Sequence, residues 1–259
     1  MTFDAYALLA LGFAAFVVAW LLYTLHLLRS DPYLGRLATG TLSVGVVMWT
    51  AGVLWRATLL GGMAGRLCDI CVLLVLLLTL GALLIEKLYR TRAFSPWSLA
   101  VAASVAGYTV VTLPYQVEAL QAVPALYRDA RFQAYQVTVL SAYASLLLAG
   151  LMASVRVFYY PLQLRFAGYA SLSVERLERT SRQVVRWALI VLAAGLALGM
   201  WWSWVASGLY WHWLAAETWV FIIWLVYAAL LHMGHFRWWP LAFAAGMVLV
   251  GFAVTTLAF

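Results

Sequence analysis

Long apolar stretches recur along the whole chain, and they constrain its fold more than any other feature. A helix needs about 20 mostly apolar residues to cross the hydrocarbon core of a bilayer, where lipid offers no hydrogen-bonding partner to an open backbone. Such stretches therefore fold as membrane-spanning helices. The sequence predicts eight of them, at residues 6–28, 38–60, 67–86, 96–114, 133–158, 184–204, 216–233 and 239–258.

The composition excludes an ordinary soluble domain. Of all residues, 66% are hydrophobic and 10% are charged, whereas soluble domains carry roughly 25% charged residues. The first stretch follows MTFDA without a basic segment or a small-residue cleavage site, so we expect a retained helix and not a signal peptide. The predicted fold class is all-α: a polytopic integral membrane protein in which residues 1–259 form a single membrane domain.

The distribution of basic residues predicts the orientation of the helices. Four alternate loops hold twelve of the 16 lysines and arginines, and basic residues accumulate on the cytoplasmic side of membranes. These twelve are Arg29, Arg36, Lys87, Arg90, Arg92, Arg156, Arg165, Arg176, Arg179, Arg182, Arg186 and Arg237. We therefore expect both termini outside, in a multi-pass protein of the cytoplasmic (inner) membrane. The net charge of +7 then serves orientation and attraction to anionic lipid, and requires no nucleic-acid partner.

The segment SLSVERLERTSRQVVRW predicts a basic helix that begins on the cytoplasmic surface. Ser173 stands where an N-cap would, Glu175 lies in the first turn, and apolar residues follow at helical spacing. The helix should continue into the span at 184–204. It either lies against lipid headgroups or is a docking site for a soluble partner.

Aromatic residues crowd the predicted outer end of that span. GMWWSWVASGLYWHW places six rings within 13 residues: Trp201, Trp202, Trp204, Tyr210, Trp211 and Trp213. Tryptophan and tyrosine commonly anchor helix ends at membrane interfaces, but such a belt needs only one or two rings per helix. The density of this cluster also suits a large planar ligand.

This cluster resembles the tryptophan-rich external signature of the cytochrome c assembly proteins of the CcsA, ResC, CcmC, CcmF and HemX type. The family pattern resembles G-x-x-W-A…W-G-x-Y-W-x-W-D-P-K-E-T-W before a span that ends Y-L-H, and this chain reads GMWWSWVASGLYWHWLAAETWVFIIWLVYAALLH. LSVERLERTSRQVVRWALIVLAAGLALG resembles the family's entering helix, and VPALYRDARFQAYQVTVLSAYASLLLAG resembles the segment around its first external histidine. The resemblance covers about residues 60–258.

The resemblance implies heme handling. Family members hold heme on the outer face, external histidines ligate the iron, and synthase members present the heme to apocytochrome c. The residues that match heme-contacting positions are Trp204, Trp211, Trp213, Glu217 and Trp219. His232 matches the histidine that ends the following span. Aromatic rings against porphyrin faces and imidazoles on iron are consistent with this chemistry.

Departures from the family pattern concern the iron ligands. Tyr135 and Gln136 stand where the family has its first external histidine, and the second would follow the last span, beyond Phe259. Leu-Ala-Ala at residues 214–216 replaces D-P-K. We therefore expect that the chain is not an autonomous cytochrome c heme lyase and that a partner supplies the missing ligands.

Four histidines are candidate ligands. His212, among the tryptophans, is either a replacement heme ligand or an imidazole exposed to water. His26 and His232 lie near the cytoplasmic ends of their spans, where ionisable groups are costly and often functional. They either clamp a heme iron together or are single hydrogen-bonded histidines. We favour His232 as a ligand because a helix end fixes its orientation, and we expect His235 to be a solvated loop residue.

Cys68 and Cys71 form the motif C-D-I-C near the predicted outer start of the span at 67–86. Such a pair indicates a redox or metal site, and the outer compartment permits a disulfide. Zinc would need four ligands, and no second pair is present. The cysteines are a candidate redox pair, or two packing residues one helical turn apart. Asp69 between them matches an acidic residue of the family.

Three function classes follow. The first is a heme-binding or heme-delivery protein whose partners are membrane lipid, other membrane subunits of an assembly or electron-transfer complex, and apocytochrome c. The second is a degenerate, non-catalytic scaffold subunit or regulator in an electron-transfer complex or in heme synthesis. The third, a small-solute transporter, is least favoured because no intramembrane charge pair or broken helix stands out.

Overall fold

The computed structural model describes residues 3–60, 67–89, 92, 94–113, 129–157, 174–232, 246 and 251. Within these ranges the regular secondary structure is helical and no strand occurs. The seven helices of this part of the chain are α1 (Phe3–Arg29), α2 (Pro32–Leu60), α3 (Leu67–Tyr89), α4 (Ser95–Thr112), α5 (Ala130–Val157), α7 (Val174–Ser207) and α8 (Ala215–His232).

Five of these helices contain segments long and apolar enough to cross a membrane. They are Ala5–Arg29, Pro32–Thr58, Cys68–Tyr89, Ala130–Val155 and Leu177–Ser207, and the apolar stretch of α8, Glu217–His232, is shorter. The prediction of an all-α, polytopic membrane protein is thereby confirmed. The count of eight stays a prediction, because the last span, at 239–258, lies outside the described residues except for Gly246 and Gly251.

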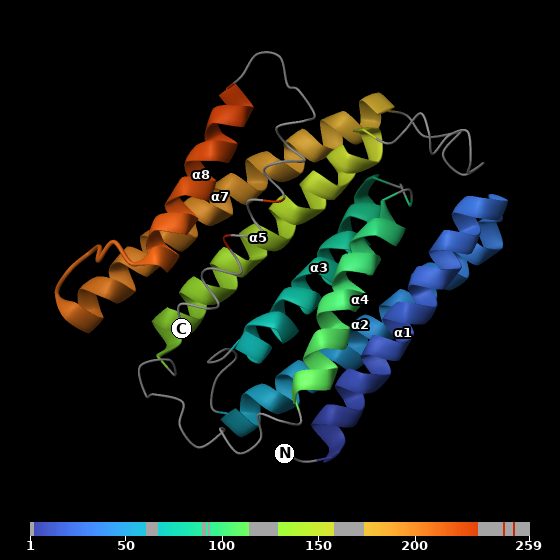
Figure 1. Ribbon diagram of the computed structural model, residues 1–259, viewed down its shortest axis with the longest axis horizontal. Helices are drawn as coiled ribbons and strands as arrows, with labels where there is room; N and C mark the ends of the chain where they lie inside the picture. Colours follow the sequence, from blue (N-terminus) through green and yellow to red (C-terminus); the bar gives the residue numbers. More distant parts are fainter. Residues whose placement is uncertain are drawn as a thin grey trace.

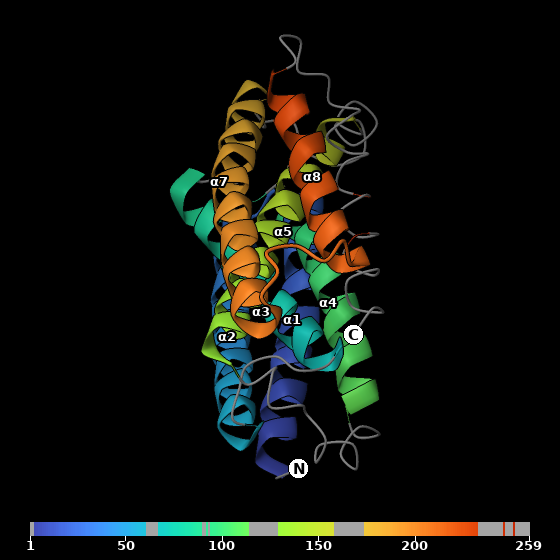
Figure 2. The ribbon, with the colours of Figure 1, turned by 90° about the vertical axis from the view of Figure 1, so that its left-hand side faces the viewer.

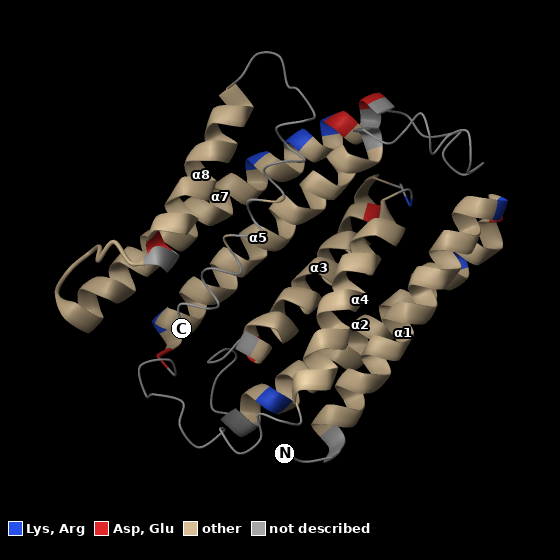
Figure 3. Cartoon of the chain, in the orientation of Figure 1, with Lys and Arg blue, Asp and Glu red and all other residues tan. Residues whose placement is uncertain are grey.

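The helices run side by side along one common direction, as two perpendicular views show (Figure 1 and Figure 2). The starts of α1, α3, α5 and α8 and the ends of α2, α4 and α7 gather at one end, at the lower left of Figure 1. We name this the outer end, because it carries the segments predicted to face outside, and we name the opposite end the inner end. The charged residues lie toward these two ends (Figure 3).

Two hydrophobic cores hold the bundle together. The first lies between α1, α2, α3 and α4 and includes Phe16, Tyr23 and Trp49. The second lies between α3, α5, α7 and α8 and includes Tyr143 and Tyr227. α3 contributes to both cores, and 72% of its most apolar stretch is buried, against 28% for α1. A helix surrounded by protein is apolar on all sides, as the sequence of α3 is.

α1 and α2 pack at close range because small residues face each other. A Cβ added to Gly12 would lie 3.2 Å from the backbone nitrogen of Trp49 and 3.3 Å from the carbonyl oxygen of Gly45. Small residues at helix interfaces allow membrane helices to approach closely. Trp49 also donates its indole N–H to the Val72 carbonyl at 2.9 Å, which joins α2 to α3.

The start of α2 differs from the prediction, whereas α7 agrees with it. α2 begins at Pro32, six residues before the predicted span at 38–60. Asp31 accepts the Tyr33 N–H at 2.8 Å, and proline at the first helical position favours the start of a helix. Both signals lie before the apolar run from which the span was predicted. α7 is one continuous helix of 34 residues, about 51 Å long and thus longer than the ~30 Å hydrocarbon core. Its predicted N-cap, Ser173, lies outside the described residues.

Candidate functional site

Aromatic side chains gather at the outer end of α7 and α8. Trp204 stacks on Tyr210 with ring centroids 4.5 Å apart and planes 10° from parallel. Trp211 meets Trp213 edge to face at 5.9 Å. Trp204, Tyr210 and Trp213 are exposed, Trp213 over 74% of its surface. We call these four residues the aromatic shelf.

His212 holds the loop that carries the aromatic shelf. Its Nδ1 lies 2.8 Å from the Ser203 hydroxyl, and its Nε2 lies 2.8 Å from the Ser207 hydroxyl, both near the end of α7. Its backbone N–H donates to Oε2 of Glu217, in the first turn of α8, at 2.9 Å. Both ring nitrogens are thus engaged, so neither is available to an iron in this arrangement.

Two residues of the same loop have positive φ, Gly208 at 76° and Trp213 at 56°. A non-glycine residue in the left-handed region costs of order 1–3 kcal/mol and persists only where its surroundings hold it. The bonds of His212 precede Trp213, and a bond from the Thr218 N–H to the Leu214 carbonyl at 2.9 Å follows it. The loop therefore fixes Trp213 in a conformation that leaves its indole exposed.

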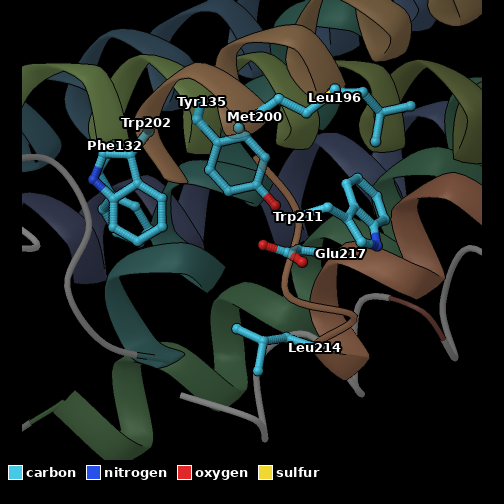
Figure 4. Close-up of a pocket in the computed structure, with 9 residues that line it drawn as sticks. Phe132, Tyr135, Leu196, Met200, Trp202, Trp211, Leu214 and Glu217 are labelled. Atoms are coloured by element: carbon cyan, nitrogen blue, oxygen red, sulfur yellow. The ribbon is translucent and has the colours of Figure 1, made fainter. Parts of the chain in front are cut away.

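A small cavity of ≈ 60 Å³ lies next to the aromatic shelf, between α5, α7 and α8 (Figure 4). It is lined by Phe132, Tyr135, Leu196, Gly199, Met200, Trp202, Trp211, Leu214 and Glu217. Tyr135, predicted to stand at the position of the family's external histidine, directs its hydroxyl toward the Glu217 carboxylate. Ligand pockets measure roughly 300–1,000 Å³, so a porphyrin does not fit inside this cavity.

The outer end fits the ring of a heme better than it fits the iron. Its exposed aromatic rings suit the face of a large planar molecule. The indole N–H groups of Trp202 and Trp211 are buried without a hydrogen-bond partner in the described part of the chain, and a ligand acceptor would satisfy such donors. Among the described residues at this end the one histidine is His212, and both of its ring nitrogens are engaged.

The two inner histidines lie on opposite sides of the bundle. The last turns of α1 and α8 carry His26 and His232, and α3, α5 and α7 stand between these helix ends (Figure 1). The structure thus does not bring the predicted pair together around one iron. Each donates its Nδ1–H to a backbone carbonyl, His26 to Asp31 at 2.6 Å and His232 to Ala228 at 2.8 Å. In a neutral imidazole, Nε2 then keeps the lone pair that a metal requires.

Cys68 and Cys71 are buried free thiols in the first turns of α3. The Cys68 sulfur lies 3.3 Å from the Thr112 hydroxyl of α4. Between the cysteines, Asp69 makes a buried ion pair with Arg56 of α2, with Nε 2.5 Å from Oδ1. Arg56 lies close to the end of one apolar segment, Pro32–Thr58, and Asp69 close to the start of the next, Cys68–Tyr89. The two charges come from different helices, so no inspection of a single span finds them together.

A second buried network surrounds Glu86 near the inner end of α3. The carboxylate accepts the hydroxyls of Tyr23 at 2.5 Å and Thr39 at 2.6 Å, and the Nε–H of Arg92 at 2.7 Å. Gly35 leaves room for this network, because a Cβ there would lie 2.8 Å from Nη1 of Arg92. α1, α2 and α3 and the segment before α4 thus meet at one paired and hydrogen-bonded charge, as burial of a charge requires.

The predicted heme contacts omit two residues of the outer site, and only one of them, Trp202, belongs to the predicted aromatic cluster. Phe132 and Trp202 pack with ring centroids 4.8 Å apart and line the cavity. The helical period distinguishes Trp202 from its neighbours. Trp201 and Trp204, three residues apart, share one face of the helix, and Trp202 lies on another, which could have indicated its different role. Trp219, predicted as a heme contact, is half-buried in α8. His235 lies outside the described residues.

The chain is similar to proteins of cytochrome c biogenesis. A "Cytochrome c biogenesis protein CcsA" of Prochlorococcus marinus subsp. pastoris is 30% identical over 215 residues, which cover 70% of this chain and 65% of the relative. A CcsA of another Prochlorococcus marinus strain is 28% identical over 215 residues, covering 70% of this chain and 66% of that one. The matched part is thus slightly less than two thirds of the length of these relatives.

A solved structure shares the fold. "Cytochrome c Heme Lyase CcmF" superposes with a TM-score of 0.54 and 20% identity, over 98% of this chain and 46% of that one. The sequence model of the family described as "Cytochrome C assembly protein" matches residues 64–259. This match covers most of the chain and includes the aromatic shelf and the cavity beside it. The chain therefore belongs to the cytochrome c assembly protein family.

Proposed function

We propose that this protein handles heme in cytochrome c biogenesis. It holds the heme at the outer face against the aromatic shelf, together with a partner that supplies iron ligands. Membership of the cytochrome c assembly family supports heme as the cargo, and the relatives named for cytochrome c biogenesis support the process. The observation that carries the proposal is the aromatic shelf, whose exposed rings, Trp204, Tyr210 and Trp213, lie at the end of α7 and on the loop that His212 holds in place.

The aromatic shelf can bind a planar ligand at low cost because it is already in place. Burial of one large aromatic side chain contributes roughly 1.5–3 kcal/mol, and Trp213 is exposed over 74% of its surface. The His212 bonds to Ser203 and Ser207 order the loop before a ligand arrives. A ligand that meets an ordered surface loses less of its binding free energy to the ordering of side chains.

The chain acts in this proposal as a holder of heme and not as an autonomous lyase. Heme brings the iron and its ligation chemistry, while the chain provides the surface for the ring. Tyr135 and Gln136 occupy the position of the external histidine of the family, and His212 serves the loop. A membrane subunit of the assembly machinery supplies the missing iron ligands. It does so before the heme is transferred to apocytochrome c.

For heme that copurifies with the isolated chain we propose a second position, at the inner end and separate from the aromatic shelf, with His232 as the ligand. Its Nδ1–H is bonded to the Ala228 carbonyl, which orients the ring and leaves Nε2 for the iron. Its position at the end of α8 is exposed, so a ligand can reach it. His26 shares the hydrogen-bonding pattern but stands on the other side of the bundle.

A scaffold subunit or regulator without heme is the second candidate function. The cavity of ≈ 60 Å³ favours it, since the space beside Tyr135 and Glu217 does not admit a porphyrin. In that case the aromatic shelf is an interfacial anchor inherited from the family.

Heme titration of the purified full chain tests these proposals. Ferric heme is added to wild type and to the double variant Trp204→Leu/Trp213→Leu, and the Soret band and tryptophan fluorescence are followed. We expect the double variant to bind roughly ten-fold more weakly, because each aromatic contact contributes about 0.5–1.5 kcal/mol. Trp187→Leu is the control, because Trp187 is also exposed on α7, over 68% of its surface, but lies far from the aromatic shelf.

The spectrum of the purified chain before heme is added tests the ligand at the inner end. His232→Ala should remove or shift the Soret band of heme that copurifies with the chain, and His212→Ala, whose hydrogen bonds lie at the outer end, should leave most of that band. If the band is lost with His212 and kept without His232, iron ligation belongs to the outer end and our assignment of His232 is wrong. If wild type shows no heme binding, alone or with its assembly partners, the scaffold function replaces heme handling.

A further inference from the structure

A groove between α3 and α5 plays no part in the aromatic shelf or in the histidine sites. It measures ≈ 460 Å³, which lies within the roughly 300–1,000 Å³ of ligand pockets. Leucines of α3 from Leu77 to Leu84 form one wall, and Ser141 and Ser145 of α5 form the other. Leu80 and Leu84 are exposed, so the groove opens on the outside of the bundle, where lipid surrounds the spans.

The polar groups in the wall of the groove need no hydrogen-bond partner from a bound molecule. The Ser141 hydroxyl donates to the Val137 carbonyl at 2.7 Å, and the Ser145 hydroxyl donates to the Ser141 carbonyl at 2.8 Å. Both serines are therefore satisfied by their own helix, and they present small, methylene-lined gaps between the leucines. An apolar chain fills such a wall without leaving a hydrogen bond unmade.

One end of the groove carries a positive charge. Lys87 lines the groove at the inner end of α3, and within the described residues no carboxylate lies in ion-pair distance of its ammonium. The neighbouring Glu86 is engaged by Tyr23, Thr39 and Arg92 on the other side of α3. From Leu77 to Lys87 a helix rises about 15 Å, which is half of the ~30 Å hydrocarbon core. The groove thus spans one leaflet.

We infer that this groove binds one acyl chain of an anionic phospholipid, with Lys87 in contact with the headgroup phosphate. The apolar wall, the length of one leaflet and a cation at the headgroup level together match this occupant and no polar solute. The inference does not depend on heme handling, because the site shares no residue with the aromatic shelf or with His232.

Native mass spectrometry of the full chain in mild detergent tests the inference. Phosphatidylglycerol is the anionic probe and phosphatidylcholine the zwitterionic one. We expect wild type to retain one phosphatidylglycerol in preference to phosphatidylcholine. Lys87→Gln should weaken retention of phosphatidylglycerol about five-fold, the effect expected of one basic residue near an anionic headgroup. Ser145→Phe, which fills the groove, should weaken the retention of both lipids.

Arg186→Gln is the matched control, because Arg186 is an exposed basic residue near the inner end on α7, outside the groove. Equal losses in Lys87→Gln and Arg186→Gln would mean a general surface-charge effect and would overturn the site. Full retention of lipid in Ser145→Phe would also overturn it. Displacement of the bound lipid by inorganic phosphate would mean that the site recognises only the headgroup. Displacement of the lipid by added heme would assign the groove to heme.

Discussion

Two glutamates, one toward each end of the bundle, organise hydrogen bonds of very different reach. Glu86 at the inner end receives donors from Tyr23 and Thr39, which are 63 and 47 positions away in the sequence. Glu217 at the outer end receives the backbone N–H of His212, five positions away. The Glu86 side chain is 7% exposed and the Glu217 side chain is 17% exposed. The first glutamate joins helices, and the second shapes a loop.

This difference separates hydrogen bonds that stabilise the whole bundle from hydrogen bonds that shape the candidate functional site. A buried carboxylate with donors from several helices stabilises the bundle as a whole, because loss of it leaves several buried groups unpaired. A carboxylate with a local donor determines the shape of one surface. By this criterion the Arg56–Asp69 pair, which joins α2 to α3, belongs with Glu86. The His212 bonds belong with Glu217.

The largest loss of stability is expected for the substitution Glu86→Ala. This change removes the carboxylate from Tyr23, Thr39 and Arg92. The Tyr23 hydroxyl then keeps only Thr39 Oγ1 at 3.2 Å, Thr39 keeps the Gly35 carbonyl at 2.9 Å, and Arg92 loses its opposite charge. Removal of one member of a buried charge pair costs roughly 3–5 kcal/mol, so we expect a large loss of stability in thermal unfolding of the detergent-solubilised protein. Glu175→Ala is the control, since its pair with Arg179 is exposed and such pairs contribute less than about 1 kcal/mol. Equal unfolding temperatures for the two variants would contradict the stabilising role of Glu86.

A loss of stability of intermediate size is expected for the substitution Asp69→Asn. Arg56 then keeps a hydrogen-bond partner but loses the opposite charge, and a hydrogen bond to a charged group contributes roughly 1.5–3 kcal/mol. The double variant Arg56→Met/Asp69→Leu should recover much of that loss, because apolar replacement of a buried pair is often neutral or stabilising. Chemical denaturation of the three proteins measures this. A double variant less stable than the single one would show that the pair itself is required.

The smallest effect on stability, and the largest on the aromatic shelf, is expected for His212→Ala. The change removes two local hydrogen bonds near the end of α7, so we expect about 1 kcal/mol or less in global stability. Hydrogen exchange at residues 208–214 should become faster while the helices keep their protection. Glu217→Gln, which retains an acceptor for the His212 N–H, should leave exchange in the loop unchanged. Faster exchange throughout α7 and α8 after His212→Ala would mean that the loop network holds helices after all.

Part of the outer site was predictable from residues close together in the sequence. The six rings of 201–213 and Glu217 follow one another along the chain, and the structure gathers them at the outer end of α7 and α8. The role of His212 was not predictable, because the choice between iron and two serine hydroxyls depends on how the loop turns back on α7. Phe132 was missed for a related reason: it reaches the cavity from α5, some 70 residues before Trp202.

The sequence by itself determined the helical membrane fold and where most of the helices lie, because apolar length and the distribution of charge act locally along the chain. It also identified the family, through the order and spacing of the tryptophan-rich segment. Only the tertiary structure decided which side chains meet across helices, because such meetings depend on how each helix is rotated and packed. Packing separates His26 from His232, pairs Arg56 with Asp69, and gathers Tyr23 and Thr39 around Glu86. A hydropathy profile is the same for every rotation of a helix about its axis, so it contains none of these contacts.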